Sequence, residues 1–204
     1  MKKLLLAILL LPLFTIAQQK RIDGYAGIMF GLSPESVKNA IEARGGVMEA
    51  SSSAKTYYFS NLSFNEHKST TMGFHFFDNK LYHAIMFFDH VDQDKVISTY
   101  NALIKELNVI YGEGSVISEF RAPYQPGDGK ELYALQNQKA SLYTTWTSHN
   151  DDGTDNVVLL NITSELSIAI SYMGGTLMKQ KDAAEEAQAQ IKPKAKAKTT
   201  AKKH

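Results

Sequence analysis

The predicted elements of this chain follow one order, a helix, a glycine stop and then antiparallel strands, and that order appears twice. The first series covers about residues 33–91 and the second about residues 92–173. Strands joined by short turns pair into one sheet, and each helix buries its apolar stripe against a sheet face. We therefore predict an α+β fold, in which one antiparallel sheet carries two helices on one face and is built from two helix-plus-meander halves.

Both predicted helices have recognisable ends. Ser33 is a suitable N-cap for the first helix, Pro34 fits its first position, and Gly45-Gly46 supplies a left-handed stop. The second helix is expected to begin near residues 92–94 and to end at Gly112. Its apolar stripe covers about four turns and consists of Val96, Ile97, Tyr100, Leu103, Ile104, Leu107, Ile110 and Tyr111.

The strands are predicted from runs of β-branched and aromatic residues. They are expected at residues 56–64, 71–77, 81–88, 116–120, 132–136, 142–148, 157–162 and 166–172. The segment 81–88 is apolar on both faces, which indicates a central position in the sheet. The segment 166–172 alternates between apolar and small or polar residues, which indicates a half-buried antiparallel strand.

A predicted hairpin at residues 78–79 determines how two histidines lie. With a two-residue loop, His75 opposes Tyr82 and His83 opposes Phe74, so the two imidazoles lie on opposite faces of the sheet. A three-residue loop would bring the imidazoles face to face. Only that second arrangement would support a metal site.

The N-terminus has the layout of a secretory signal peptide. Lys2 and Lys3 precede an apolar run at 4–14, and Thr15 and Ala17 fit a cleavage site before residue 18. We expect a periplasmic or secreted protein whose α+β domain covers 18–179, with no transmembrane segment after cleavage. The chain has no cysteine, so it cannot be a lipoprotein, and its stability must come from packing and not from disulfides.

Charge is divided unevenly between the domain and the C-terminal tail. Residues 18–191 carry fourteen basic and twenty-one acidic side chains, whereas 192–204 hold six lysines and no acid. We expect residues 180–204 to form an Ala/Lys-rich basic tail that is largely disordered, with any short helix at 180–191 ending at Pro193. The tail either contacts a polyanion or an acidic partner, or serves only solubility.

The aromatic, hydroxyl-rich segment around Trp146 is a candidate binding surface. Trp146 and Tyr143 lie among threonines, a combination that can grip a glycan or a protein partner. Core packing of Trp146 is the alternative, and the usual one for tryptophan. The loop 123–129 is either a mobile connector or a presented binding loop.

Acidic clusters and catalytic motifs give no site. The aspartates at 89, 92 and 94 suit helix capping, and those at 151, 152 and 155 suit a polar hairpin loop. Neither stretch has the ligand spacing of a calcium-binding loop. The sequence contains no nucleophile elbow, zinc-protease motif or phosphate-binding glycine loop. We expect no catalytic residue, metal or cofactor.

The entry to the first helix reads Gly27-Ile28-Met29-Phe30-Gly31-Leu32-Ser33-Pro34-Glu35-Ser36-Val37. This entry, the glycine stop and the aromatic hairpin resemble small secreted bacterial proteins of unknown function. In architecture the chain is similar to the β-lactamase-inhibitor-protein fold and to the small lipoprotein of the outer-membrane β-barrel assembly machine. The resemblance covers about residues 27–172 and implies a binding or scaffolding role. The missing lipid-anchor cysteine departs from the assembly lipoprotein.

These observations favour an exported, non-enzymatic binding or accessory protein of the cell envelope. It would hold a protein partner through its sheet face or loops, helped by the tail. The expected contact residues are Trp146, Tyr143, Lys192, Lys194, Lys196, Lys198, Lys202 and Lys203. The alternative is an envelope enzyme or small-ligand carrier with a pocket between helices and sheet, which needs a buried polar cluster near His83. A third hypothesis is a polyanion binder that acts through the tail alone.

Overall fold

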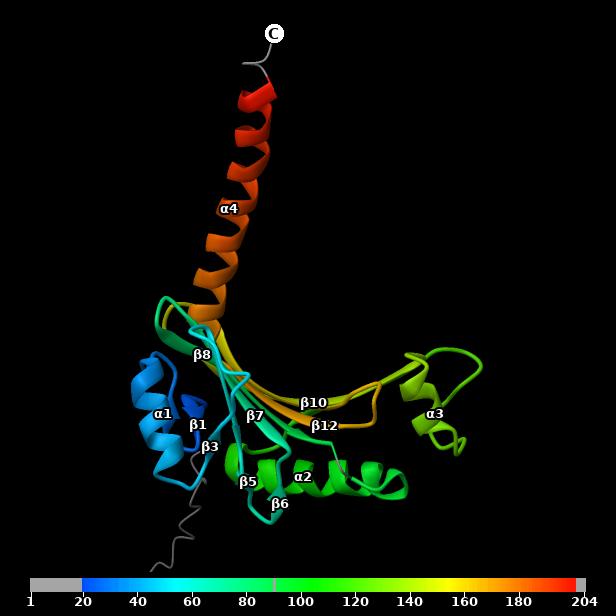
Figure 1. Cartoon of the computed structure of the whole chain (residues 1–204). Coiled ribbons are helices and arrows are strands. Elements are labelled where there is room, and N and C mark those ends of the chain that lie inside the picture. Colours follow the sequence, from blue (N-terminus) through cyan, green and yellow to red (C-terminus); the bar gives the residue numbers. More distant parts are fainter. Residues whose placement is uncertain (1–19, 90, 201–204) are drawn as a thin grey trace, which may run out of the picture.

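The computed structural model describes residues 20–89 and 91–200, with side chains described as far as residue 189. The predicted signal peptide and its cleavage site lie outside these residues. One large curved sheet dominates the molecule, and a long C-terminal helix projects from it (Figure 1). The chain therefore combines helices with a large antiparallel sheet, as predicted.

All neighbouring strands of the eight-stranded sheet are antiparallel. Their spatial order is β3 (Val47–Met48), β4 (Thr56–Ser60), β7 (Thr71–Phe77), β8 (Lys80–Phe88), β12 (Ile168–Met173), β11 (Asp155–Ile162), β10 (Ala140–His149) and β9 (Ser115–Phe120). Two small two-stranded sheets accompany it, formed by β1 (Gly24–Tyr25) with β2 (Ile28–Met29) and by β5 (Ser63–Phe64) with β6 (His67–Lys68). The segment expected as one strand at 56–64 is thus divided between β4 and β5.

The described residues form four α-helices and not two: α1 (Pro34–Glu42), α2 (Val96–Tyr111), α3 (Glu131–Gln136) and α4 (Gly175–Thr200), with a 3₁₀ turn η1 (Gln93–Lys95) before α2. The predicted cap of α1 is confirmed, because the backbone N–H of Ser36 donates to Ser33 Oγ at 3.2 Å. Gly45 adopts a φ of +85° after α1 and Gly112 a φ of +80° after α2. Both expected helix stops are therefore in place.

Helix α3 corrects a predicted strand. Residues 132–136 were expected to be extended, but they lie inside α3, where Ala134 and Leu135 are buried. These residue types favour a helix, and a single turn and a half is too short to show helical periodicity. The strand that pairs with β9 is β10 instead.

Strand β12 corrects a second expectation. It lies between β8 and β11, and Ala169 and Ser171 on its non-core face are 2% and 6% exposed. Their side chains are small, so the larger residues of neighbouring strands shield them. The strand is therefore buried on both faces and not half-buried.

Helix α4 begins at Gly175, five residues earlier than expected, and does not end at Pro193. The backbone N–H of Gly175 donates to Asn156 Oδ1 at 2.9 Å, which satisfies one of the unpaired donors at the helix start. The tail expected to be largely disordered lies in α4 as far as Thr200.

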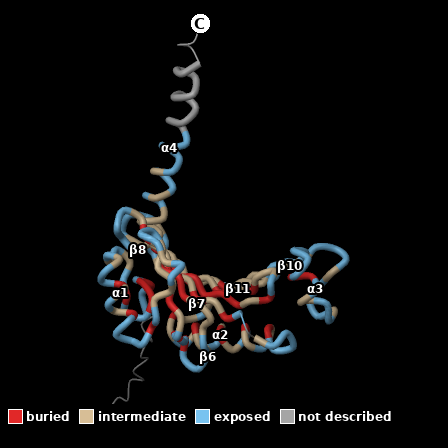
Figure 2. Tube along the Cα trace, in the orientation of Figure 1, coloured by how far each residue is buried: buried red, intermediate tan, exposed pale blue. Residues whose placement is uncertain are grey.

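Buried residues lie along the central strands of the sheet (Figure 2). Along β8 and β11 they alternate with less buried residues, so the hydrophobic core occupies one face of the sheet. Its largest fully buried side chains include Phe59, Phe74 and Trp146. Helix α2 covers this face: Tyr100 Oη and Thr144 Oγ1 are 2.8 Å apart, and both residues are buried. Because strand residues alternate between faces, the opposite face carries the intervening residues.

Candidate functional site: the open face of the sheet

The central part of the sheet face opposite α2 carries uncharged, partly apolar side chains. Helix α4 leaves the sheet at one end of this side and projects away from it, while α2 lies against the outer, convex side (Figure 1). We call this stretch the open face, and strand pairing places on it Tyr58, Gly73, Ile85, Phe87, Ala169, Ser171, Leu159, Asn161, Tyr143 and Thr145. None of these ten residues is Asp, Glu, Lys or Arg. Charged groups lie around them on the same face: Glu119 pairs with Ser141, Asp155 pairs with His149, and Thr71, opposite Phe87, donates a hydrogen bond to Glu49.

The open face is partly accessible to solvent. Ile85, Phe87, Leu159 and Tyr143 are all of intermediate exposure. Strand β12 contributes the small side chain of Ala169 to the open face. The open face is therefore more recessed along β12 than along the neighbouring strands. A curved surface of this kind removes apolar area from water when a partner covers it.

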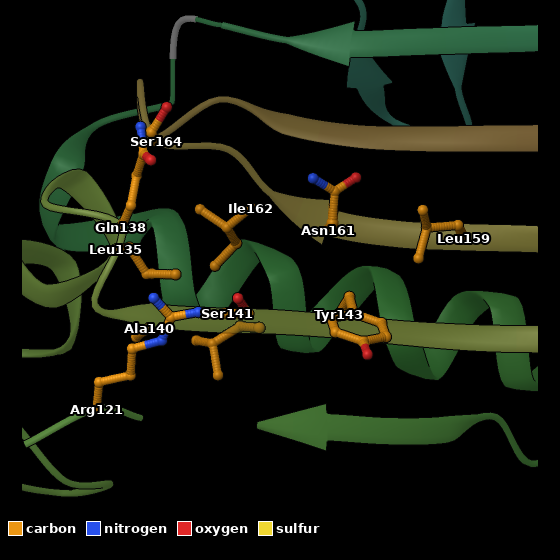
Figure 3. A pocket seen from close by; sticks show the side chains of 11 residues that line it. Arg121, Leu135, Gln138, Ala140, Ser141, Tyr143, Leu159, Asn161, Ile162 and Ser164 are labelled. Atoms are coloured by element: carbon orange, nitrogen blue, oxygen red, sulfur yellow. The ribbon is translucent and has the colours of Figure 1, made fainter. Parts of the chain in front are cut away.

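A hollow of about 580 Å³ lies at one end of this surface, where β10 begins and β11 ends. Figure 3 shows its lining side chains projecting from the two strands, from the end of β9 and from the adjoining turns. The lining residues are Arg121, Leu135, Gln138, Ala140, Ser141, Leu142, Tyr143, Leu159, Asn161, Ile162 and Ser164. We call this the β10–β11 hollow.

Most polar side chains of the β10–β11 hollow have no hydrogen-bond partner within the described part of the chain, and the exception is Ser164, whose hydroxyl donates to Glu165 Oε1 at 3.0 Å. Five lining side chains make no hydrogen bond to other described residues: Arg121, Gln138, Ser141, Tyr143 and Asn161. Polar side chains elsewhere in the chain form such hydrogen bonds at many positions. Arg121 also has no ion pair among these residues. No carboxylate lines the hollow. The site is therefore a set of open hydrogen-bond donors and acceptors around one cation.

The histidine arrangement predicted for a two-residue loop is wrong. The loop does have two residues, both in the left-handed region, with φ of +49° and +56° at 78–79. A β-bulge follows, because Phe76 pairs with Leu81 whereas His75 pairs with His83. The extra residue shifts the register by one, so the two imidazoles share a face.

The two imidazoles stack with ring centroids 5.0 Å apart and planes at 16°. His75 Nδ1 lies 3.2 Å from Thr56 Oγ1, whereas the buried His83 Nε2 has no partner among the described residues. Burial, and secondarily the neighbouring His75, lower the pKa of His83 to about 4. Burial also lowers the pKa of His75. The His83 ring is therefore neutral near pH 7, and burial disfavours the charged form of His75. No group of three metal-ligating side chains occurs in the described residues.

The two acidic clusters serve local structure. Asp152 accepts hydrogen bonds from Thr154 and Thr176, which lower the pKa of its carboxyl to about 2. It thereby ties the β10–β11 loop to the start of α4. Asp92 makes no capping hydrogen bond to the backbone and pairs with Lys95 instead, so the capping expected there is not observed.

The predicted contact residues lie in different surroundings. Trp146 is 2% exposed, and its indole N–H donates to Asn108 Oδ1 and to the Gly112 carbonyl, so it is a core residue. Tyr143 lies on the open face and lines the β10–β11 hollow. The lysines at 192, 194, 196 and 198 belong to α4 beyond the described side chains, and Lys202 and Lys203 lie outside the described residues.

The loop 123–129 is ordered by its own hydrogen bonds. The backbone N–H of Gln125 and that of Lys130 both donate to the Asp128 carboxylate. The N–H of Gly127 donates to Glu131 Oε1 at 2.8 Å, which fastens the loop to the start of α3. The loop therefore connects β9 to α3 through a segment with several hydrogen bonds of its own.

Sequence reasoning did not identify the β10–β11 hollow, apart from Tyr143. Its residues come from β10, β11, α3 and three connecting segments, after β9, after α3 and after β11, and no spacing in the sequence connects them. No known family model, curated protein or solved structure matches this chain. Within the described residues no helix is long and apolar enough to cross a membrane.

Proposed function

We propose that this chain is an exported, non-enzymatic binding protein that holds an envelope protein through the open face of its sheet. The observation that carries the proposal is the presence of partly exposed apolar side chains, Ile85 and Phe87 on β8 with Leu159 on β11, on one face of the sheet. Solvent-exposed sheet faces of antiparallel sheets ordinarily carry polar residues. Partly exposed apolar side chains on such a face, here Ile85, Phe87 and Leu159, are a feature of interaction sites. The occupant would present a convex apolar surface to it.

The architecture we propose is a tandem of two helix-plus-meander halves with two helices on one face. The strand order supports it: β3, β4, β7 and β8 follow α1, whereas β9, β10, β11 and β12 follow α2. The last strands of the two halves, β8 and β12, pair at the centre of the sheet. Such a tandem is similar to the β-lactamase-inhibitor-protein architecture.

The basic tail is proposed as a second contact. Residues 192–204 carry six lysines, opposite in charge to an acidic partner surface. Contacts of this kind weaken as salt rises, because mobile ions screen exposed charges. Removing 192–204 should therefore reduce partner retention at low salt and have less effect at high salt.

The test is an in-cell cross-linking pull-down of the tagged protein with one charge placed on the open face. Phe87→Glu should abolish recovery of a single stoichiometric partner, since burying an unpaired carboxylate is costly. Val109→Glu is the matched control, because Val109 is 89% exposed on α2. Circular dichroism and thermal melting confirm that both variants fold. Equal recovery with both variants, or loss of all binding on removal of the tail alone, would reject the open face as the site.

A further inference from the structure

We propose that the β10–β11 hollow binds an acidic sugar unit, such as one uronic acid residue of an oligosaccharide. This inference concerns a ligand distinct from the protein partner and does not depend on that partner. The hollow measures about 580 Å³, which lies within the range of small-ligand sites. It holds one ring of a sugar chain while its open side leaves room for the neighbouring units.

The polarity of the hollow indicates a ligand with many hydroxyl groups. Two amides, Gln138 and Asn161, offer both donors and acceptors, and Ser141 adds a hydroxyl. Their polar atoms make no hydrogen bonds to other described residues, so they are available to a ligand. A polyol satisfies such a mixed set better than a purely apolar molecule or a simple anion does.

The charge of the hollow indicates that the ligand is anionic. Arg121 is exposed, has no ion pair among the described residues, and belongs to a lining without Asp or Glu. A guanidinium presents a planar fork of donors that matches a carboxylate. Glu119, the sheet partner of Ser141, lines an adjoining hollow with Arg121 but makes no ion pair with it among the described residues. The guanidinium of Arg121 is therefore available to pair with a uronate carboxylate.

The apolar part of the hollow fits the C–H face of a pyranose ring. Tyr143 and Leu159 are diagonal neighbours on the open face, since Tyr143 pairs with Asn161 and Leu159 with Thr145. The tyrosine ring joins an apolar body to a polar hydroxyl. Figure 3 places Tyr143 and Asn161 beside each other on adjacent strands, so one ring can contact an aromatic face and an amide together.

The test titrates the isotope-labelled chain 18–204 with trigalacturonate and follows backbone amide shifts by NMR. The trimethyl ester of the same trisaccharide removes the charge and keeps the rings, and triglutamate supplies carboxylates without sugar. We expect saturable shifts at residues 138–143 and 159–164 with trigalacturonate, with a Kd of the order of 1 mM. The ester should bind about tenfold more weakly, and triglutamate should cause no comparable shifts.

Three variants assign the roles of the side chains. Arg121→Gln should remove the preference for the acid over the ester, whereas Tyr143→Ala should weaken both ligands. Lys105→Gln, an exposed cation on α2, should change neither. Unshifted amides outside the hollow show that each variant is folded.

Each contrary outcome overturns the proposal. No saturable shift with trigalacturonate would show that the hollow is not a sugar site. Equal binding of triglutamate would mean that it recognises carboxylates, as an acidic-peptide site does. Unchanged acid preference in Arg121→Gln would remove the assigned role of the cation.

Discussion

The two faces of the sheet differ, although the same strands build both. On β8 the residues Met86 and Phe88 are 1% and 3% exposed, whereas Ile85 and Phe87 between them are partly accessible. The first pair belongs to the core that α2 covers. Ile85 and Phe87 are also apolar, but they lie on the opposite face and do not contribute to that core. The difference indicates that the apolar residues of the core face stabilise the fold, whereas for the open face we propose a role in binding.

The largest expected effect separates a core residue from an open-face residue. Trp146→Ala should lower the free energy of unfolding by about 3–5 kcal/mol, because it leaves a cavity and removes two hydrogen bonds of the indole. Phe87→Ala should cost less, about 1–2 kcal/mol, because Phe87 is partly exposed and its loss leaves no closed cavity. Urea unfolding of both variants measures the contrast. Similar losses would show that both faces stabilise the fold.

A pH titration tests the histidine pair. The pKa of His83 is about 4 in the folded chain and near 6.5 in the unfolded chain, so the unfolded state takes up the proton first. Stability should fall by about 3 kcal/mol between pH 6.5 and pH 4 on this account.

His83→Gln should remove that part of the pH dependence, and His149→Gln is the control, since the His149 side chain is 88% exposed. Denaturant midpoints across this pH range provide the measurement. The same slope in the His83 variant and in the original chain would contradict the burial of a neutral imidazole.

The packing of Trp146 against the segment after α2 can also be tested by enlarging Gly114, which lies in that segment. A Cβ at Gly114 would lie 2.6 Å from the indole Cε2 and 2.8 Å from Thr144 Cγ2. Gly114→Ala should therefore cost about 1–3 kcal/mol. In a Trp146→Leu background the added methyl meets a smaller side chain, so the same change should cost less. Thermal unfolding of the original chain, the two single variants and the double variant gives the coupling free energy between the two positions. Additive losses of stability would contradict the clash.

The smallest expected effect concerns the buried pair of Tyr100 and Thr144. Tyr100→Phe removes the 2.8 Å hydrogen bond and leaves the threonine hydroxyl without its partner, at a cost of about 1 kcal/mol. The double variant with Thr144→Val should recover part of the loss, since neither polar atom remains unsatisfied. Chemical denaturation measures the difference. Failure of the second change to restore any stability would argue against a shared hydrogen bond.

Much of the local structure was predictable because it depends on neighbours in the sequence. The cap at Ser33, the stop at Gly112 and the strand at 71–77 follow from side-chain chemistry and alternation. The burial of Trp146 agrees with the usual position of tryptophan.

The rest depends on contacts between distant segments. The bulge at His75 depends on long-range strand pairing, because β7 pairs with β4 on one side and with β8 on the other and its register must suit both strands. Helix α3 is too short to produce a periodic pattern. The β10–β11 hollow joins Arg121, Gln138 and Asn161 across forty positions of sequence, and only the sheet register brings them together.

Site-specific photo-cross-linking shows whether a partner covers the open face. A photoreactive amino acid is placed in the full chain at Phe87 on the open face or at Val109 on α2, and cross-linking is carried out in living cells. We expect one major protein adduct from position 87 and none from position 109. An adduct that forms only from position 109, or equally from both positions, would contradict the assignment of the open face as the binding surface.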